Sequence, residues 1–589
     1  MSIIGSNILA GAAGQGGGYV IDNSLRFRSS ASAYLNRTFA STPTSYTASF
    51  WIKRGTLGVL QQIFASRLSG TGAAFIQFNG SDQLVVANNA TSITTTAVYR
   101  DPSAWYHFVV SWTSGNVVTI YCNGVSQTVT GSISGASQLF TSSWISTVGR
   151  YGDFNGNYLD GYLTEVNFID GQALTPSSFG EYNATTGVWQ PAAYAGTYGT
   201  NGFYLPFSDA TNTTTLVADS SGQGNDWTPN NISLTAGVTY DSMTDTPTPY
   251  ADGGNYAVLN PLFPAGSSGA VPSNANLAVT VSPSATNAVS SMGMSSGKFY
   301  WEYTWTYTAG GLFVGIDSNL TLSATQAAGS LSTGYGYYNA NGNKYNSGTG
   351  TAYGTAWFSS GQTYVIGVAF DATNGTLTYY LNNVSQGTAF TGIPAGTYYA
   401  STSYQSGSGS TTCYFNFGQR PFSYTPPTGF LPLHTGNLPD AAIVNGSEYF
   451  AATTYTGNGG TQSISNDVNG VSFQPDWVWV KARSAAIAGL VYDSVRGATK
   501  YLQTNSVATE GTGADSLTAF ASNGFTVGAD TSTTGVNQNT TTYVGWQWKA
   551  GGAAVTNELG SITSQVSASP TAGFSVVTYT GNGTQPSTV

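Results

Sequence analysis

The chain has 589 residues, of which 40% are hydrophobic, 13% aromatic and only 7% charged. One hydrophobic core does not grow to this length, and the apolar content is too high for a disordered chain, so we expect several folded domains. The formal net charge of −10, with only 16 Lys and Arg, argues against a nucleic-acid partner, because binding a phosphate backbone needs clustered basic residues. No apolar run reaches the roughly 18 residues that span a bilayer, and we expect no membrane insertion.

The composition predicts an all-β fold. Gly (74) and Tyr (38) are abundant, and charge-rich amphipathic stretches are scarce. Short runs alternate apolar and polar residues, as in strands with one face in a core and the other in water. We expect tandem β-sandwich (jelly-roll) domains in an elongated homo-oligomer, since few charged residues protect exposed strand edges and packed subunits would cover them.

The first segment, residues 1–22, is apolar, Gly-rich and too short to fold alone. We expect it to dock onto another protein, and the apolar side chains available for this are Ile3, Ile4, Ile8 and Leu9. The alternative is a disordered leader. The segment lacks the basic start and the apolar core of a secretion signal.

Residues 23–185 contain several strand patterns: Ser49-Phe-Trp-Ile-Lys53, Trp105-Tyr-His-Phe-Val-Val-Ser-Trp112 and Gly161-Tyr-Leu-Thr-Glu-Val-Asn-Phe168. In this order they resemble the laminin-G-like, concanavalin-type jelly roll. That family has a Trp-Tyr-His strand, then a strand that ends in Asn-Gly, and a late strand with Gly-x-x-x-Glu-Val. Residues 186–255 are rich in turn residues and predict a connector, part of which is a candidate to complete the jelly roll.

Residues 256–435 contain Ser296-Gly-Lys-Phe-Tyr-Trp-Glu302, Gly367-Val-Ala-Phe-Asp371 and Cys413-Tyr-Phe-Asn-Phe-Gly418. These motifs resemble the SPRY β-sandwich over nearly its whole length. One departure is Asn382-Asn383, where the family usually has Asn-Gly at a hairpin tip. The turn survives this change because Asn tolerates the left-handed conformation.

Residues 436–572 predict a further β-rich module. Its string Thr454-Tyr-Thr-Gly-Asn-Gly459 returns 124 residues later, and residues 573–589 therefore predict the start of a second copy. Together with Phe473-Gln-Pro-Asp-Trp-Val-Trp-Val-Lys481, this arrangement resembles the repeated modules of long bacteriophage tail proteins. We expect the natural chain to continue beyond residue 589.

Catalysis is not expected. Laminarinase-like relatives of the jelly roll carry a Glu-x-Asp-x-x-Glu string, and a retaining glycosidase needs two carboxyl groups about 5–5.5 Å apart. The corresponding string here has Glu165, Asn167 and Asp170, so one carboxylate is missing and another is one carbon short. His107 and His434 are too few for a zinc site, and we expect both to be structural.

Metal sites, disulfides and other cofactors are also not expected. Asp153, Asp160 and Asp170 surround the late strand where some laminin-G-like domains hold calcium, but turn aspartates that bond local backbone explain them better. Cys122 and Cys413 lie in separate predicted domains. The loop segments 335–345 and 225–227 carry aromatic and amide side chains suited to carbohydrate recognition, although core packing is the default role of each ring.

Taken together, the chain resembles a tail fibre of a tailed bacteriophage that contacts a glycan or protein on the host surface. The resemblance implies a virion protein that is released by host lysis, docks onto other tail proteins through its amino terminus, and forms a homotrimer. Receptor contacts are expected in the carboxy-terminal half, which would lie farthest from the particle. The alternatives are a structural virion protein, such as a head decoration or a collar fibre, and a polysaccharide depolymerase.

Overall fold

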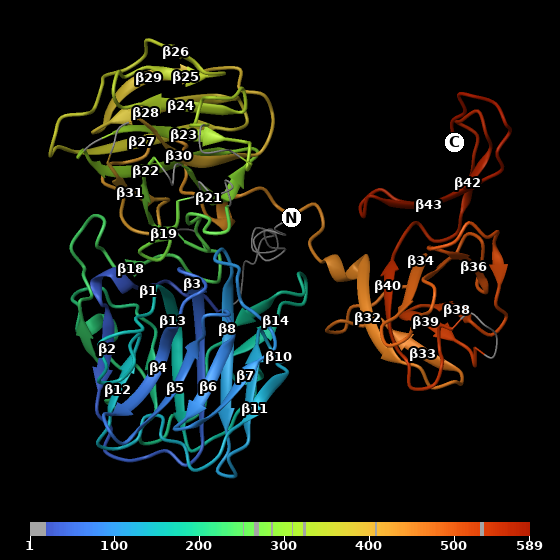
Figure 1. The fold of residues 1–589 in the computed structure, drawn as a ribbon, viewed down its shortest axis with the longest axis horizontal. Helices are drawn as coiled ribbons and strands as arrows, with labels where there is room; N and C mark the ends of the chain where they lie inside the picture. Colours follow the sequence, from blue (N-terminus) through green and yellow to red (C-terminus); the bar gives the residue numbers. More distant parts are fainter. Residues whose placement is uncertain are drawn as a thin grey trace. The chain divides into compact units, whose positions relative to one another are not determined.

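The computed structural model describes residues 19–589 except 251–252, 264–269, 284–286, 309, 322–325, 407–408 and 531–534. Ile3, Ile4, Ile8 and Leu9 lie outside the described residues. The chain divides into two compact units, the first with residues up to 181 and 188–440, the second with residues 182–187 and 441–589. Antiparallel strands dominate (Figure 1), which confirms the predicted all-β fold of tandem β-sandwiches. The described helices are single 3₁₀ turns: η1 (Ser29–Ala31), η2 (Pro176–Ser178), η3 (Thr215–Val217), η5 (Thr435–Asn437) and η6 (Gly446–Glu448).

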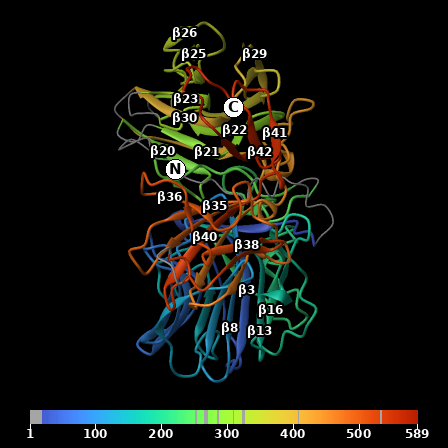
Figure 2. The ribbon, with the colours of Figure 1, turned by 90° about the vertical axis from the view of Figure 1, so that its right-hand side faces the viewer.

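The jelly roll consists of two packed eight-stranded sheets. The first has the order β10-β9-β8-β3-β13-β1-β18, with β16 also paired to β13; Figure 2 labels β8, β3, β13 and β16 of this sheet. Its strands are β1 (Ser24–Phe27), β3 (Tyr46–Arg54), β8 (Trp105–Trp112), β9 (Val118–Cys122), β10 (Val125–Ser126), β13 (Gly161–Asp170), β16 (Phe203–Leu205) and β18 (Ser242–Met243). The second has the order β11-β7-β6-β5-β4-β12-β2-β17. Its strands are β2 (Tyr34–Arg37), β4 (Gln61–Leu68), β5 (Gly72–Phe78), β6 (Leu84–Asn88), β7 (Thr91–Thr95), β11 (Val129–Ser132), β12 (Ile145–Val148) and β17 (Thr228–Asn230).

Three pieces of the segment expected as a connector extend these sheets. β16 pairs with β13, β17 pairs with β2, and β18 pairs with β1. Phe203 of β16 and Trp227, just before β17, are buried with Phe39 and Phe140 in the core between the sheets. The short strands β14 (Gly180–Tyr182) and β15 (Trp189–Pro191) pair with each other across the predicted start of the connector.

The SPRY-like sandwich also has two sheets. The seven-stranded sheet has the order β19-β20-β31-β22-β27-β28-β29. Its strands are β19 (Pro272–Ser273), β20 (Ala278–Val281), β22 (Lys298–Thr306), β27 (Thr363–Asp371), β28 (Thr376–Leu381), β29 (Val384–Phe390) and β31 (Thr411–Asn416). The six-stranded sheet has the order β21-β30-β23-β24-β25-β26. Its strands are β21 (Asn287–Met294), β23 (Gly311–Asp317), β24 (Gly334–Tyr338), β25 (Lys344–Asn346), β26 (Thr349–Thr351) and β30 (Tyr398–Ser406).

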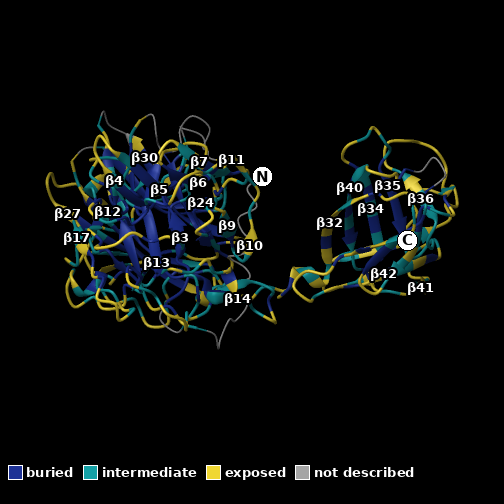
Figure 3. Ribbon diagram, turned by 90° about the horizontal axis from the view of Figure 1, so that it is seen from below, coloured by how far each residue is buried: buried dark blue, intermediate teal, exposed yellow. Residues whose placement is uncertain are grey.

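The two sandwiches of the first unit share a buried junction. Lys53 Nζ on β3 donates to Asp245 Oδ2 at 2.7 Å, to Asn255 Oδ1 at 2.8 Å and to the Tyr256 carbonyl oxygen at 2.7 Å. Trp105 Nε1 donates to the other oxygen of Asp245 at 3.0 Å. Apolar residues of the jelly-roll sheet, Trp51 among them, join one hydrophobic cluster with the SPRY-like core. β3 is buried on both faces along its whole length (Figure 3), because this junction covers Trp51 and Lys53 while Gln172 and His107 contact Thr47 and Ser49 on the same face.

The second unit is a smaller β-module of three sheets, of order β32-β40-β34-β35-β36-β37, β33-β39-β38 and β41-β42-β43. Val478 and Val480 of β34 face the core, whereas Trp477 and Trp479 lie half-buried on the opposite face. The strands are β32 (Phe450–Thr456), β33 (Gln462–Ser465), β34 (Trp477–Ala482), β35 (Leu490–Asp493), β36 (Lys500–Gln503), β37 (Gly511–Thr512), β38 (Leu517–Ala521), β39 (Gly524–Val527), β40 (Thr542–Trp548), β41 (Val555–Asn557), β42 (Ser564–Ser569) and β43 (Phe574–Tyr579).

Candidate functional site

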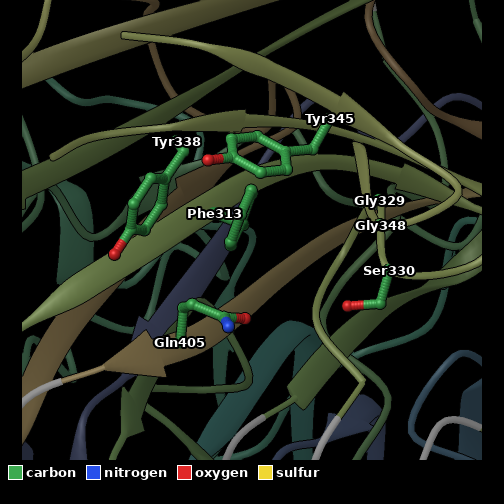
Figure 4. A pocket seen from close by; sticks show the side chains of 7 residues that line it. All are labelled: Phe313, Gly329, Ser330, Tyr338, Tyr345, Gly348 and Gln405. Atoms are coloured by element: carbon green, nitrogen blue, oxygen red, sulfur yellow. The ribbon is translucent and has the colours of Figure 1, made fainter. Parts of the chain in front are cut away.

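A cavity of about 320 Å³ lies on the six-stranded SPRY-like sheet, where β23, β24, β25 and β30 bring distant residues together (Figure 4). Its lining residues are Phe313, Gly329, Ser330, Tyr338, Tyr345, Gly348 and Gln405. No ionisable carboxylate, Lys, Arg or His belongs to this set. The cavity therefore combines aromatic walls with uncharged hydrogen-bonding groups.

Three rings form the aromatic wall. Phe313 on β23 and Tyr338 on β24 are cross-strand partners, and their rings stack with centroids 4.5 Å apart at 21°. Tyr345 on β25 meets Phe313 edge-on at 5.1 Å and Tyr338 edge-on at 5.8 Å. Phe313 is buried against Ala327 and Ala328, whereas Tyr338 and Tyr345 are half-buried, so one ring supports two that remain accessible.

The loop before β24 forms the opposite wall and approaches β25 closely. Gly329 has φ +93°, and a Cβ atom there would lie 2.5 Å from the Tyr345 carbonyl oxygen, so this position needs glycine. The Gly348 amide donates to the Gly329 carbonyl oxygen at 2.9 Å. The Ser330 hydroxyl accepts from the Ala327 amide at 2.9 Å, and Asn341 Nδ2 donates to the Tyr345 hydroxyl at 3.1 Å. Backbone and side-chain hydrogen bonds thus hold the cavity shape.

The segment 335–345, singled out in the sequence for carbohydrate recognition, supplies part of this site. Tyr335 and Tyr337 face the core, whereas Tyr338 and Tyr345 line the cavity. The other predicted loop does not form a site, because Trp227 is 2% exposed and packs in the jelly-roll core. Sequence reasoning missed Phe313 and Gln405, which lie on strands far from this segment and carry no motif of their own.

Glu165 lies on β13 at a β-bulge between Thr164 and Asn167. Glu165 is only 7% exposed. Its carboxyl group accepts hydrogen bonds from Tyr204 Oη at 2.6 Å and from Tyr19 Oη at 3.1 Å. Burial raises the pKa of Glu165 to about 7. Asn167 Oδ1 accepts from Tyr198 Oη at 2.8 Å, so the neighbouring position holds an amide engaged by a tyrosine.

The histidines and aspartates named in the sequence contact groups of the chain itself. His107 is buried between Trp189, whose Nε1 donates to His107 Nδ1 at 2.9 Å, and Ser49, whose Oγ lies 2.8 Å from His107 Nε2. His434 Nδ1 accepts from the Gly436 amide at 3.2 Å. Asp170 Oδ2 accepts from the Asn201 amide at 2.9 Å, and Asp160 Oδ2 accepts from the Ala275 amide at 3.1 Å. Asp153 pairs with Arg67.

Across the described ranges, no three His, Cys, Asp or Glu side chains gather as a metal site would require. Cys122 and Cys413 are buried free thiols. None of the described helices is long and apolar enough to cross a membrane.

Three protein families match separate parts of the chain. The concanavalin A-like lectin/glucanases superfamily matches residues 27–178, and the SPRY domain family matches residues 298–420. The family described as a domain of unknown function (DUF7483) matches residues 445–589 as one stretch.

Several solved structures are similar to parts of the chain at low identity. The SPRY domain of human HERC1 is 19% identical, with 24% of this chain and 87% of that chain covered and a TM-score of 0.21. The heptameric SAP-like pentraxin from Limulus polyphemus is 18% identical, with 27% and 80% covered and a TM-score of 0.22. A putative carbohydrate binding protein from Bacteroides ovatus is 17% identical, with 36% and 59% covered and a TM-score of 0.27. The family matches establish that this chain contains a laminin-G-like, concanavalin-type domain followed by a SPRY domain.

Proposed function

We propose that this chain is a receptor-binding adhesion protein of a bacteriophage tail fibre, and that the aromatic cavity of its SPRY domain binds an uncharged sugar ring on the host surface. The observation that carries the binding role is the cavity itself, in which stacked and edge-on rings lie beside Ser330 and Gln405. A sugar ring offers apolar C–H faces to aromatic side chains and hydroxyl groups to polar ones.

The tail-fibre assignment draws its support from the sequence. Lectin-like and SPRY domains precede a module whose string Thr454-Tyr-Thr-Gly-Asn-Gly459 recurs near residue 580, as in long tail proteins. In this proposal residues 1–22 dock onto other tail proteins, and the chain is a homotrimer on the virion that reaches the outside by host lysis. Three linked copies would turn a weak sugar contact into avidity that exceeds the single-site affinity by about 10²–10⁴.

The proposed role is non-catalytic. At the positions that glycosidases of this fold would use, Glu165 accepts hydrogen bonds from Tyr19 and Tyr204, the shorter Asp170 accepts from the Asn201 amide, and Asn167 stands where a further carboxylate would be needed. Incubating the protein with polysaccharide from a susceptible host should therefore release no new reducing ends. Release of oligosaccharides that depends on Glu165 would instead favour a depolymerase.

The binding role is tested by substitution inside and outside the cavity. We expect Tyr338→Ala and Tyr345→Ala each to weaken binding to arrayed neutral oligosaccharides by about tenfold, because each removes a ring contact of up to about 1.5 kcal/mol. Tyr380→Ala on β28 is the matched control, since Tyr380 is a half-buried tyrosine of the other sheet that does not line the cavity. Equal losses in all three variants would contradict the proposed site.

Sugar binding by the purified protein and adsorption of the particle to cells are measured separately. If purified protein binds no array sugar and particles that lack it still adsorb to cells, the structural alternative of a head decoration or collar fibre would stand. The mass of the protein in solution tests the proposed trimer separately, and a monomer at micromolar concentration would contradict it.

A further inference from the structure

The buried carboxyl group of Glu165 forms a closed cluster with two tyrosines from distant parts of the chain. Tyr204 Oη on β16 donates to Glu165 Oε1 at 2.6 Å, and Tyr19 Oη donates to Glu165 Oε2 at 3.1 Å. The two hydroxyl groups also lie 2.8 Å from each other. Tyr19 comes directly after residues 1–18. The cluster therefore attaches the first described residue of the chain to the jelly roll.

The backbone at Glu165 is unusual for this residue type. Glu165 has φ +50°, within the bulge of β13 between Thr164 and Asn167. A left-handed residue other than glycine costs about 1–3 kcal/mol and persists only where surrounding contacts maintain it. The hydroxyl groups of Tyr19 and Tyr204 contact the carboxyl group, so the cluster supplies contacts that maintain this backbone conformation.

Within the part of the chain that the structure describes, no cation compensates the carboxylate. The groups that face the cluster are Tyr19, Tyr204 and Tyr198, with Asp22 and Asp219 farther out, and all of these are neutral or acidic near pH 7. Burial raises the pKa of Glu165 to about 7 against the ordinary 4.5, and the hydrogen bonds from the tyrosines offset only part of this. Closed, the cluster therefore keeps a proton on Glu165 where an open, hydrated carboxyl group would lose it. In this protonated form one carboxyl oxygen donates to a tyrosine hydroxyl, which donates to the other tyrosine, so each of the three contacts holds one hydrogen.

Tyr19 makes the first of several contacts that residues 19–22 form with the rest of the first unit. Farther along, the Ile21 amide donates to Thr248 Oγ1 at 3.3 Å, and Tyr250 Oη donates to the Asp22 carbonyl oxygen at 2.8 Å. Opening at Tyr19 weakens the hold on the following residues, including the Ile21 amide, without requiring the jelly roll to unfold.

We propose that Glu165, Tyr19 and Tyr204 form a pH-sensitive latch that holds residue 19 against the jelly roll in acid and releases it as the pH rises through neutrality. The sign follows from proton binding: between about pH 4.5 and 7 the closed form holds one proton more than the open form. The closed-to-open ratio therefore falls about tenfold per pH unit, or about 300-fold across the window. The latch is independent of sugar binding on the SPRY domain.

Hydrogen–deuterium exchange of the full chain, corrected for chemical exchange, tests the latch at pH 5.5, 6.5, 7.5 and 8.5. In the wild type we expect protection of peptides around residues 19–24 to fall as the pH rises. Glu165→Gln keeps a neutral side chain of the same shape and should keep protection constant, so that at pH 8.5 the wild type exchanges at least about tenfold faster. Peptides from β22 and β27 provide the internal reference.

Tyr19→Phe is the second variant, because it keeps the ring and the buried carboxyl group but removes one hydroxyl. Protection around residue 19 should then be low at every pH, with the fold of the remaining peptides unchanged. The proposal is overturned if the wild type and Glu165→Gln show the same pH dependence, or if Tyr19→Phe exchanges like the wild type at pH 5.5.

Discussion

At the scale of single residues, His107 shows how burial converts a histidine into an acid-sensitive point of the fold. The Trp189 indole can only donate, so His107 Nδ1 accepts and Nε2 carries the proton of the neutral ring. Burial lowers the pKa of His107 to about 3 from 6.5. Between about pH 6.5 and 3 the unfolded chain therefore binds a proton at His107 and the folded chain does not. The free energy of unfolding falls by up to about 5 kcal/mol as the pH drops through this range.

We expect His107→Gln to flatten the loss of stability between pH 7 and pH 4.5, measured as the denaturant midpoint of the first unit. Glu165 acts with the opposite sign in part of this range, since its raised pKa makes the folded state lose stability as the pH rises from about 4.5 to 7. The double variant with Glu165→Gln separates the two effects. Parallel pH profiles for the wild type and His107→Gln would show that the ring is not the acid-sensitive group.

At the scale of elements, β32 and β43 each end within a copy of the string Thr-Tyr-Thr-Gly-Asn-Gly, but the two copies lie in different environments. In β32, Tyr455 stacks on Tyr543 at 5.0 Å, donates to the Val536 carbonyl oxygen at 2.7 Å and packs on the module core. The equivalent residue in β43, Tyr579, is 59% exposed. Sequence repetition therefore does not imply equal energetic weight.

The two tyrosines form a matched pair for mutation. We expect Tyr455→Ala to lower the free energy of unfolding of the second unit by about 2 kcal/mol, somewhat less than for a fully buried ring, because Tyr455 is half-buried. Tyr579→Ala should change it by less than about 0.5 kcal/mol, because little of its surface is buried. Chemical denaturation followed by tryptophan fluorescence measures both, and a large effect of Tyr579→Ala would show that β43 is packed more closely than its exposure indicates.

At the scale of the whole molecule, the junction around Lys53 joins the lectin-like and SPRY domains into one cooperative unit. We expect calorimetry to show two unfolding transitions and not three, one for each compact unit. Lys53→Met leaves Asp245 buried without its cation and should destabilise the first unit by about 3–5 kcal/mol.

Variants assign the two transitions. Lys53→Met should move only the transition of the first unit, and Tyr455→Ala only that of the second. A third transition in the wild type, or a separate shift of one sandwich in Lys53→Met, would mean that the two domains of the first unit unfold independently.

The sequence by itself determined the all-β class and the likeness of two regions to known sandwiches, because a period of two and turn residues are local properties that any strand displays. It also marked the segment that carries Tyr338 and Tyr345. Only the tertiary structure decided that Phe313, Gln405 and these tyrosines share one cavity, that Asp245 meets a lysine 192 residues away, and that Tyr19 covers Glu165. Each of these depends on the register of the sheets and on which residues cover the second face of a strand. Both are set by contacts between residues that are distant in the sequence.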